Sequence, residues 1–334
     1  MARRPLRWAL WVTLAGLAAY LVATLLGWPR GIERAEVWLR YRVAGVVASP
    51  LLVGQHGRLF LGNHAGDPPL SLITTICGQI PGLADQAGAF LRPVLDAGRA
   101  TGVPFRLIVV PTPPRLYPED LPAGIPCAHW PADQLHDPAI VYPVAALQAM
   151  KPGIDPIPRR HFHWAGEAPL QVAELVANEM GLSRALTLSL RPERRPSDFN
   201  GINPGLALYD EVRAPNLRAA GVAQCAGSRC VPALPDAIEL FSRPGPGRIL
   251  VFADSFGDAI AGDWSEYAGQ VWHVRMNLAL ASPEPALAAA LHEVHPDAVI
   301  VVYHDFAALA LDVASKASLA LAARLLDGLR TAGE

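Results

Sequence analysis

The sequence of 334 residues predicts a three-layer α/β/α domain with a mainly parallel sheet, preceded by one N-terminal transmembrane helix. Three observations indicate this architecture: a long uncharged run near the N-terminus, short apolar runs rich in β-branched residues, and helical patterns between those runs. Hydrophobic residues make up 51% of the chain, so a large core is expected. The formal net charge is −2 and no basic stripe is present, which argues against a nucleic-acid-binding function.

The N-terminal segment has the features of a membrane anchor. Arginines within the first seven residues precede an uncharged run from Trp8 to Trp28. As a helix this run would extend over roughly 31 Å, about the thickness of a bilayer's hydrocarbon core. The arginines favour a cytoplasmic N-terminus. We therefore expect residues 1–30 to form a cytoplasmic N-terminus and a single-pass inner-membrane anchor, and residues 31–334 to form one extracytoplasmic domain.

Two other interpretations of this segment stay open. A cleaved secretory signal would have a shorter apolar region and a small-residue cleavage site, whereas this run ends in Leu-Leu-Gly-Trp-Pro. A buried helix of a soluble core is the other alternative, although uncharged runs of this length are uncommon in soluble folds. With an anchor or with a cleaved signal, the body of the protein would lie in the periplasm or another extracytoplasmic space.

The four cysteines are consistent with an exported chain. An even number of cysteines permits disulfides in an oxidising compartment. Cys225 and Cys230 could close a small loop, and Cys77 and Cys127 are a second possible pair. A zinc site is less expected, because no Cys-x-x-Cys pair occurs.

The elements after the anchor alternate between helices and strands. A helix is expected over residues 33–47, a turn, a short strand and another turn over 54–63, and a helix near 83–101. Residues 105–110 form an apolar run whose length and β-branching favour a buried parallel strand. Further strands are expected over residues 139–142, 187–190, 248–252, 270–274 and 298–302, and further helices over residues 144–150, 166–180, 286–292 and 311–329. Residues 191–246, rich in Pro, Gly and Arg, show no pattern that predicts their structure.

Ser255 follows the predicted strand at residues 248–252. In open α/β sheets ligands bind at the carboxyl ends of the strands, and a serine on a turn there is exposed beside backbone N–H groups that can hold an oxyanion. The alternative is a serine that caps the next helix. His304 and Asp305 follow the strand at 298–302, where they could line the same cleft or simply be polar loop groups.

A serine nucleophile needs a general base, which is usually histidine. His161 and His163 are two residues apart, so they share one face of an extended segment. They could instead be structural, or bind zinc, although no third ligand with a familiar spacing is evident. An ordinary lipase or protease is a weaker hypothesis, because the Gly-x-Ser-x-Gly elbow is absent and the candidate base precedes the serine.

Five segments of the chain match the motifs of one known family in order. Residues 57–63 look like its Gly-Trp-Leu-Phe-Leu motif, and residues 103–122 resemble its strand followed by Pro-Lys-x-x-Tyr-Pro-x-x-Leu-Pro. Residues 161–166 stand where the family has Asp-x-His-Trp-x-x-Gly, with the Gly one position closer. Residues 253–256 stand at its Gly-Asp-Ser-Phe, and residues 296–300 at the strand that follows. The chain after the anchor thus resembles the AlgX/AlgJ-type polysaccharide O-acetyltransferases, an SGNH-hydrolase-like family.

The resemblance implies an O-acetyltransferase, or an acetylesterase of the same chemistry. Ser255 would attack an acetyl group with His163 as general base, and a hydroxyl of an exported polysaccharide would take the acetyl group from the serine. The backbone N–H of Ser255 would hold part of the oxyanion. A separate, multi-spanning membrane acyltransferase would supply the acetyl group, and neither a metal nor a cofactor is expected.

The chain departs from the family at two positions. His161, which we keep among the catalytic residues, stands where the family has an acid, and a neutral imidazole cannot supply the negative charge that orients and stabilises the base. Ala253 replaces a glycine and constrains the backbone beside the nucleophile. A carboxylate from elsewhere is a possible replacement for the acid, with Asp155, Glu167 and Asp198 as candidates. The alternative function is a catalytically degenerate protein that binds polysaccharide or scaffolds an export complex.

Three further residues complete the predicted site. Trp164, His304 and Asp254 are expected to bind substrate around the Ser255–His163 dyad. Asp254 should also point away from Ser255 and form local hydrogen bonds, so it is not expected to be the triad acid. A long distance between serine and base would favour the non-catalytic function, whereas a close approach joined by a carboxylate would favour catalysis.

Overall fold

The computed structural model describes residues 11, 13–19, 22, 35–63, 68, 70–125, 127, 129–203, 205–232, 234–309 and 313–330. Its centre is a seven-stranded sheet in the order β4-β3-β11-β9-β10-β8-β7. Five neighbouring strands are parallel: β4 (Ile140–Val141), β3 (Phe105–Val110), β11 (Ala298–His304), β9 (Arg248–Ala253) and β10 (Gln270–Arg275). β8 (Ile238–Ser242) and β7 (Ala223–Ala226) complete one edge in antiparallel orientation. The predicted α/β fold with a mainly parallel sheet is confirmed.

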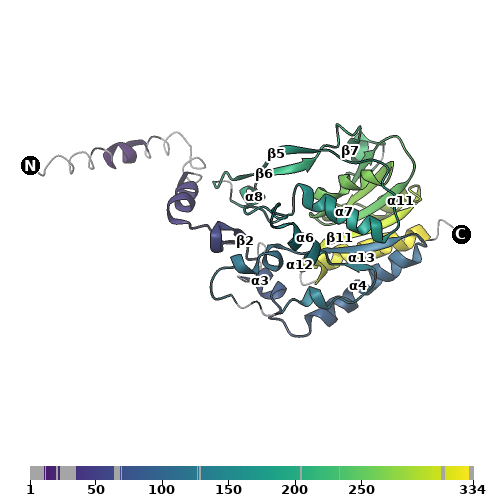
Figure 1. Cartoon of the computed structure of the whole chain (residues 1–334), viewed down its shortest axis with the longest axis horizontal. Helices are drawn as coiled ribbons and strands as arrows, with labels where there is room; N and C mark the ends of the chain where they lie inside the picture. The colour runs from purple at the N-terminus through teal and green to yellow at the C-terminus, as the bar shows by residue number, and fades with distance from the viewer. Residues whose placement is uncertain are drawn as a thin grey trace, which may run out of the picture.

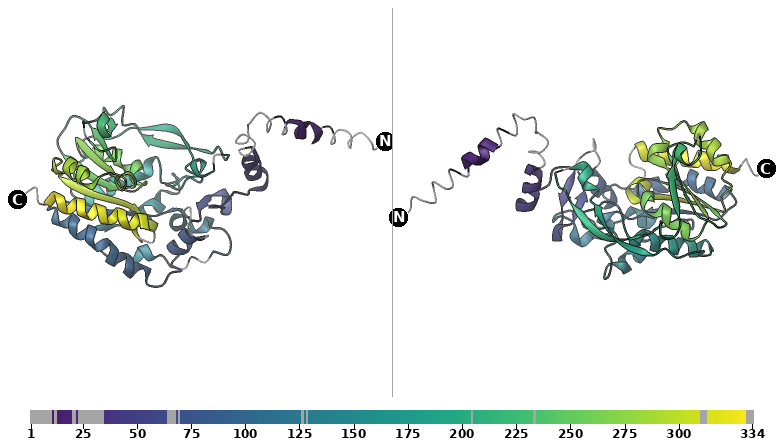
Figure 2. Two further views of the ribbon diagram at one scale, coloured as in Figure 1. Left: turned by 180° about the vertical axis from the view of Figure 1, so that it is seen from behind. Right: turned by 90° about the horizontal axis from the view of Figure 1, so that it is seen from above.

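Helices cover both faces of the sheet (Figure 1). On one face α4 (Leu83–Ala100) and α13 (Val313–Arg330) pack side by side, as both views of Figure 2 also show, together with α11 (Glu284–His292). On the other face lie α7 (Glu167–Glu179) and α6 (Val144–Met150). Because side chains of a strand alternate between faces, neighbouring residues of the central strands enter two different hydrophobic cores.

The central strands explain why this sheet forms. All seven residues of β11 are buried, and β3 and β9 are buried at nearly every position. Strands covered on both faces need continuous apolar runs, and β-branched residues suit a pleated, buried surface. The expected strands at 105–110, 248–252, 270–274 and 298–302 therefore all form, each within two residues of its predicted ends.

The shorter elements connect and flank these layers. Two small antiparallel sheets pair β1 (Leu51–Val53) with β2 (Leu59–Leu61) and β5 (Leu190–Pro196) with β6 (Tyr209–Pro215). Further helices in the part of the chain that the structure describes are α3 (Ser71–Ile76), α5 (Pro113–Leu116), α8 (Phe199–Ile202), α9 (Gly257–Ile260), α10 (Met276–Ala279) and α12 (Asp305–Ala308). Short 3-10 turns are η2 (Gln55–Gly57), η3 (Pro118–Asp120), η4 (Pro131–Gln134), η5 (Gly227–Arg229) and η6 (Ala261–Glu266).

One predicted strand does not form over most of its length, and one region without a predicted structure contains strands. Residues 187–189 are not in a strand, because the Leu188 N–H donates to the Glu266 carboxylate (2.6 Å) instead of to a neighbouring strand. The region 191–246, for which no structure was predicted, contains the β5–β6 hairpin, β7 and β8. This hairpin arches over the same face of the sheet as α7 (Figure 1).

The N-terminal part is described only in pieces. The expected anchor at residues 8–28 lies largely outside the described residues, and the described residues include no helix with the length and apolar character needed to cross a membrane. The expected helix at 33–47 is described from residue 35, continues as the π-helical turn η1 (Arg40–Ala44) and ends at Gly45, which has a φ of 64°. Both possible cysteine pairs form disulfides, Cys77–Cys127 and Cys225–Cys230.

Candidate active site

The carboxyl ends of the central parallel strands meet at one edge of the sheet. The strand register places Val302 of β11 beside Ala253 at the end of β9. It also places His304 beside Val110 at the end of β3. Ser255 lies on the turn between β9 and α9, so the nucleophile candidate stands at this edge as predicted from its position after a strand.

The Ser255 turn is held by its neighbour Asp254. One carboxylate oxygen of Asp254 accepts from the Phe256 N–H (2.9 Å), and the other accepts from the His304 N–H (2.8 Å) and lies 2.5 Å from the His304 ring Nδ1. Asp254 therefore bonds locally and ties the end of β9 to the end of β11. A contact between Asp254 and substrate stays a prediction.

A glycine makes the tight turn possible. A Cβ on Gly257 would lie 2.0 Å from the Cβ of Ala253, a distance at which the two atoms overlap. The methyl group of Ala253 thus fills the space above Gly257. This is how the chain accommodates Ala253 where the resembling family has glycine.

Ser255, His163 and Asp198 form a continuous hydrogen-bonded chain. Ser255 Oγ lies 2.8 Å from His163 Nε2, and His163 Nδ1 lies 3.0 Å from Asp198 Oδ2. Because a carboxylate only accepts, Nδ1 carries the ring proton, which leaves Nε2 to accept the serine hydroxyl proton. This is the arrangement of a nucleophile, a general base and an orienting acid.

Asp198 is brought to the base by the β5–β6 hairpin. Its Oδ2 also accepts from the backbone N–H groups of Phe162 (3.1 Å) and His163 (3.0 Å). The adjacent Ser197 hydroxyl donates to the Arg160 carbonyl, and the Asn200 side chain bonds both backbone groups of Leu208 at 2.7 and 2.8 Å. These contacts fix the loop that carries the acid.

The other two candidate acids have different partners. Asp155 bonds the buried Arg58 guanidinium (3.1 Å) and the Tyr117 hydroxyl, and Glu167 pairs with Arg213 (2.7 Å). Of the three carboxylates proposed to replace the acid, only Asp198 has a contact with His163.

The charge on Asp198 is stabilised by two histidines. Burial by itself would raise the pKa of Asp198, but the imidazoles of His161 and His163 outweigh it and hold this pKa well below the usual range of a carboxyl. His161 is only 1% exposed and lies between two carboxylates, Asp198 and Asp210. The acid candidate is thus ionised at neutral pH, as an orienting group must be.

Aromatic rings surround the base. The indole of Trp164 is fully buried and donates to the Phe256 carbonyl (2.9 Å), so it has no surface for substrate and the expected substrate contact is not supported. The His304 ring, 8% exposed as a residue, stacks on Phe256 with ring centroids 5.1 Å apart. Phe256 also lies against the His163 ring at 4.7 Å. Substrate contact by His304 remains a prediction.

One backbone donor beside the nucleophile is available. Over the described residues, the backbone N–H of Ser255 has no hydrogen-bond acceptor, whereas the N–H groups of Asp254, Phe256 and Gly257 are all bonded. A free N–H at the nucleophile is the donor expected to hold an oxyanion.

The histidines that could bind a metal have carboxylate neighbours. The described ranges contain no group of three or more His, Cys, Asp or Glu side chains that could hold a metal ion. His163 Nδ1 is hydrogen-bonded to Asp198, and His161 Nδ1 lies 3.4 Å from the same carboxylate oxygen.

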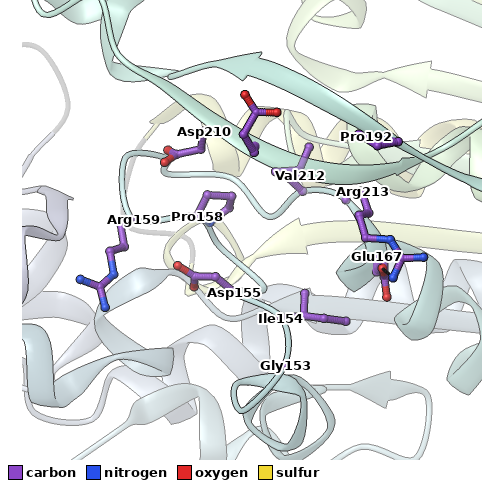
Figure 3. A pocket seen from close by; sticks show the side chains of 13 residues that line it. Gly153, Ile154, Asp155, Pro158, Arg159, Glu167, Pro192, Asp210, Val212 and Arg213 are labelled. Atoms are coloured by element: carbon purple, nitrogen blue, oxygen red, sulfur yellow. Dashed lines mark ion pairs between the residues drawn. The ribbon is translucent and has the colours of Figure 1, made fainter.

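A cavity of about 430 Å³ lies between the β5–β6 hairpin and residues 153–167 (Figure 3). Arg213 lies beside Glu167 at one end, and Asp155 and Arg159 lie toward the other. Ser255 does not line it. Asp210, which does, links the cavity wall to the buried His161.

Comparison with solved structures identifies the fold. A DHHW family protein from Eubacterium siraeum superposes with a TM-score of 0.50 at 13% identity, over 70% of this chain and 88% of that protein. The two proteins share a fold. The O-acetyltransferase domain of Pseudomonas putida AlgJ is also similar, with a TM-score of 0.48 at 15% identity over 79% of this chain and 94% of that domain.

A third similar structure is Pseudomonas aeruginosa AlgX, with a TM-score of 0.45 at 15% identity over 83% of this chain and 67% of that protein. No protein-family model matches this chain, and no curated protein sequence matches it.

Proposed function

We propose that this protein is a serine O-acetyltransferase, or an acetylesterase of the same chemistry, that acts on hydroxyl groups of an exported polysaccharide. The observation that carries the proposal is the contact chain from Ser255 Oγ through His163 to Asp198, with separations of 2.8 and 3.0 Å. The choice of acetyl as the transferred group and of polysaccharide as the acceptor is supported by the resemblance of five ordered sequence segments to the AlgX/AlgJ-type family.

In the first half-reaction Ser255 Oγ bonds to the acetyl carbonyl carbon while its proton moves to His163 Nε2. The backbone N–H of Ser255 would stabilise the oxyanion, and Asp198 would stabilise the imidazolium. The bond to the leaving group then breaks as the leaving group takes the proton from His163, which leaves an acetyl-serine.

In the second half-reaction a polysaccharide hydroxyl gives its proton to His163 Nε2 as its oxygen attacks the acetyl carbon. Ser255 Oγ leaves and recovers the proton, so the enzyme returns to its starting state. Water in place of the sugar hydroxyl would give acetate, which is the esterase outcome.

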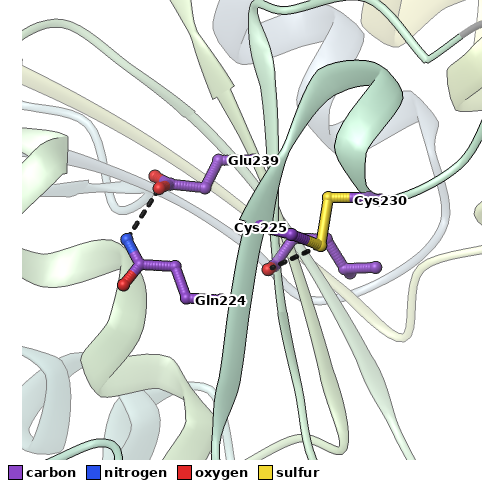
Figure 4. The surroundings of a disulfide bond; sticks show 5 residues. Gln224, Cys225, Cys230 and Glu239 are labelled. Carbon is purple, nitrogen blue, oxygen red and sulfur yellow. Dashed lines mark hydrogen bonds between the residues drawn. A yellow bond between two sulfur atoms is a disulfide. The ribbon is translucent and has the colours of Figure 1, made fainter.

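An extracytoplasmic location fits two features of the chain. Disulfides persist in oxidising compartments, and Cys225–Cys230 (Figure 4) and Cys77–Cys127 both form. The arginine-flanked apolar run at residues 8–28 fits a membrane tether. We propose that this tether keeps Ser255 close to a membrane-bound acyltransferase that supplies the acetyl group.

The alternative is a non-catalytic protein, and it rests on His161, which stands where the motif of the resembling family has an acid. The geometry favours catalysis, because a carboxylate from the β5–β6 hairpin reaches the base at 3.0 Å. A binding protein would have no need of a serine, a base and an acid in this order.

Acetate release from an activated ester tests the proposal. The full chain, purified in detergent, should hydrolyse p-nitrophenyl acetate, and Ser255→Ala should reduce the rate to that of buffer. Activity of the wild type that survives in Ser255→Ala would refute the role of Ser255. Transfer to added acetyl-free oligosaccharides, followed by mass spectrometry, would then separate transferase from esterase.

A further inference from the structure

We propose that His161 is a positioning residue of the triad: a doubly protonated imidazole that bridges Asp198 and Asp210 and holds Asp198 against the base. The inference rests on the proposed serine chemistry and adds two residues to it. His161 would not touch substrate. It would act through Asp198.

The contacts of the His161 ring carry the proposal. Its Nδ1 lies 3.4 Å from Asp198 Oδ2, and its Nε2 lies 3.5 Å from Asp210 Oδ2. The His161 side chain is fully buried, and the two carboxylates are 23% and 19% exposed. Each ring nitrogen therefore lies within ion-pair distance of a carboxylate oxygen inside the protein, and neither contact has the geometry of a hydrogen bond.

The chemistry of the ring indicates its protonation state. A neutral imidazole has one N–H and one lone pair, so one of its nitrogens would face a carboxylate with lone pair against lone pair. An imidazolium has an N–H at both ring nitrogens and a positive charge that attracts both carboxylates, without requiring a hydrogen bond to either. Its charge between two negative charges also avoids an unpaired charge in a buried site.

The distances describe an ionic clamp. Separations of 3.4 and 3.5 Å are longer than strong hydrogen bonds, so the attraction between charges makes the larger contribution. Asp198 Oδ2 is then held by His161 and by the backbone and ring of His163. Asp210, on β6 of the same hairpin, anchors the far end of the clamp.

The clamp also accounts for the departure at position 161. The residue two before the base, which is an acid in the motif of the resembling family, lies 3.4 Å from the acid that contacts the base here. Here that position holds a cation, and the acid comes from the hairpin, 35 residues beyond His163. The sign of the charge at 161 and the origin of the acid have changed together.

Substitution kinetics test the proposal. His161→Gln and Asp210→Asn in the full chain should each lower kcat for p-nitrophenyl acetate about 10- to 100-fold with little change in KM, the range found when orienting partners are removed. In an Asp198→Asn background the His161→Gln substitution should lower kcat less than about 2-fold further, because its effect passes through Asp198. Independent effects that multiply in the double variant would overturn the proposal, as would a wild-type kcat in both single variants.

A matched control separates the clamp from general destabilisation. Glu239, on β8, has a carboxylate oxygen 3.3 Å from Nδ1 of another fully buried histidine, His273. Glu239 also accepts a hydrogen bond from the Gln224 side chain (Figure 4). Glu239→Gln removes a carboxylate from a buried histidine that lies beside Gly257 but has no hydrogen bond or ion pair with Ser255, His163 or Asp198 among the described residues, and its kcat should stay within about 2-fold of wild type. An equal loss of kcat in Glu239→Gln would overturn the assignment.

Nitrogen NMR measures the protonation state of the His161 ring independently of catalytic activity. In protein labelled with ¹⁵N-histidine, the signals lost in His161→Gln should report two protonated ring nitrogens at pH 7. If His161→Gln does not fold, Asp210→Asn should shift the same signals. A His161 ring with one protonated nitrogen would overturn the clamp but leave the proposed function standing. Wild-type protein that is inactive but has a doubly protonated His161 ring would overturn the proposed function and leave the clamp standing.

Discussion

His163 Nδ1 lies 3.0 Å from Asp198 Oδ2, although the two residues are 35 positions apart and belong to different elements. His163 precedes α7, whereas Asp198 follows the β5–β6 hairpin's first strand. This contact supplies the base with an acid that the sequence around the base lacks. The candidate site therefore depends on how the hairpin folds over the sheet edge.

Asp198→Asn should lower kcat by about 10⁴-fold, because an amide cannot stabilise the imidazolium and would favour the wrong tautomer of His163. Ester hydrolysis by the full chain measures this. Glu167→Gln is the matched control, since Glu167 pairs with Arg213 and does not contact the base. A similar loss in both variants would contradict the assignment of the acid.

Gly257→Ala should destabilise the protein and remove ester hydrolysis, because the new methyl group would overlap that of Ala253. Adding Ala253→Gly vacates the space and should restore part of both properties. Thermal unfolding and kcat of the single and double variants test this. No rescue by Ala253→Gly would show that the clash with Ala253 does not decide the turn.

Asp263→Asn should stabilise the protein at alkaline pH. Burial, with a smaller contribution from Glu266, raises the pKa of Asp263 well above its usual value. The native state then binds more protons than the unfolded state, so the free energy of unfolding falls by about 1.4 kcal/mol per pH unit from about pH 4 up to the folded pKa. Asparagine does not titrate, so the free energy of unfolding of the variant lacks this decrease with pH.

Urea unfolding at pH 5 and pH 8 checks the effect, which should be larger at pH 8. The surface variant Glu284→Gln, which removes only an exposed pair with Arg324, should change the free energy of unfolding by less than about 1 kcal/mol at either pH. A gain for Asp263→Asn that is equal at both values would contradict the buried-carboxyl explanation.

The two disulfides should contribute unequally to stability. Cys77–Cys127 spans 50 residues and Cys225–Cys230 spans 5, so the first restricts the unfolded chain more. Loop-closure entropy gives about 4 kcal/mol for the first and about 2 kcal/mol for the second. Double Cys→Ala variants of each pair, unfolded in urea, measure the difference, and a larger loss for the shorter loop would contradict it.

The central strands could be predicted because their burial on both faces requires apolar runs that the sequence shows directly. Ser255 and His163 could be predicted because one follows such a strand and the other lies in a recognisable motif. The hairpin could not, since β5 and β6 have no fully buried position and contain many Arg, Glu and Pro residues. Asp198 stayed one of three candidates, because its contact with the base depends on that hairpin. The full burial of Trp164 could not be predicted either, since it depends on long-range packing.

A fluorophosphonate probe on the full chain, followed by peptide mass spectrometry, tests the central claim most directly. The account predicts one covalent adduct, on Ser255, that forms in folded wild-type protein. Asp198→Asn should slow the labelling strongly, and His163→Ala should abolish it. Folded protein in which the probe spares Ser255, or labels it equally fast in all three forms, would contradict the account.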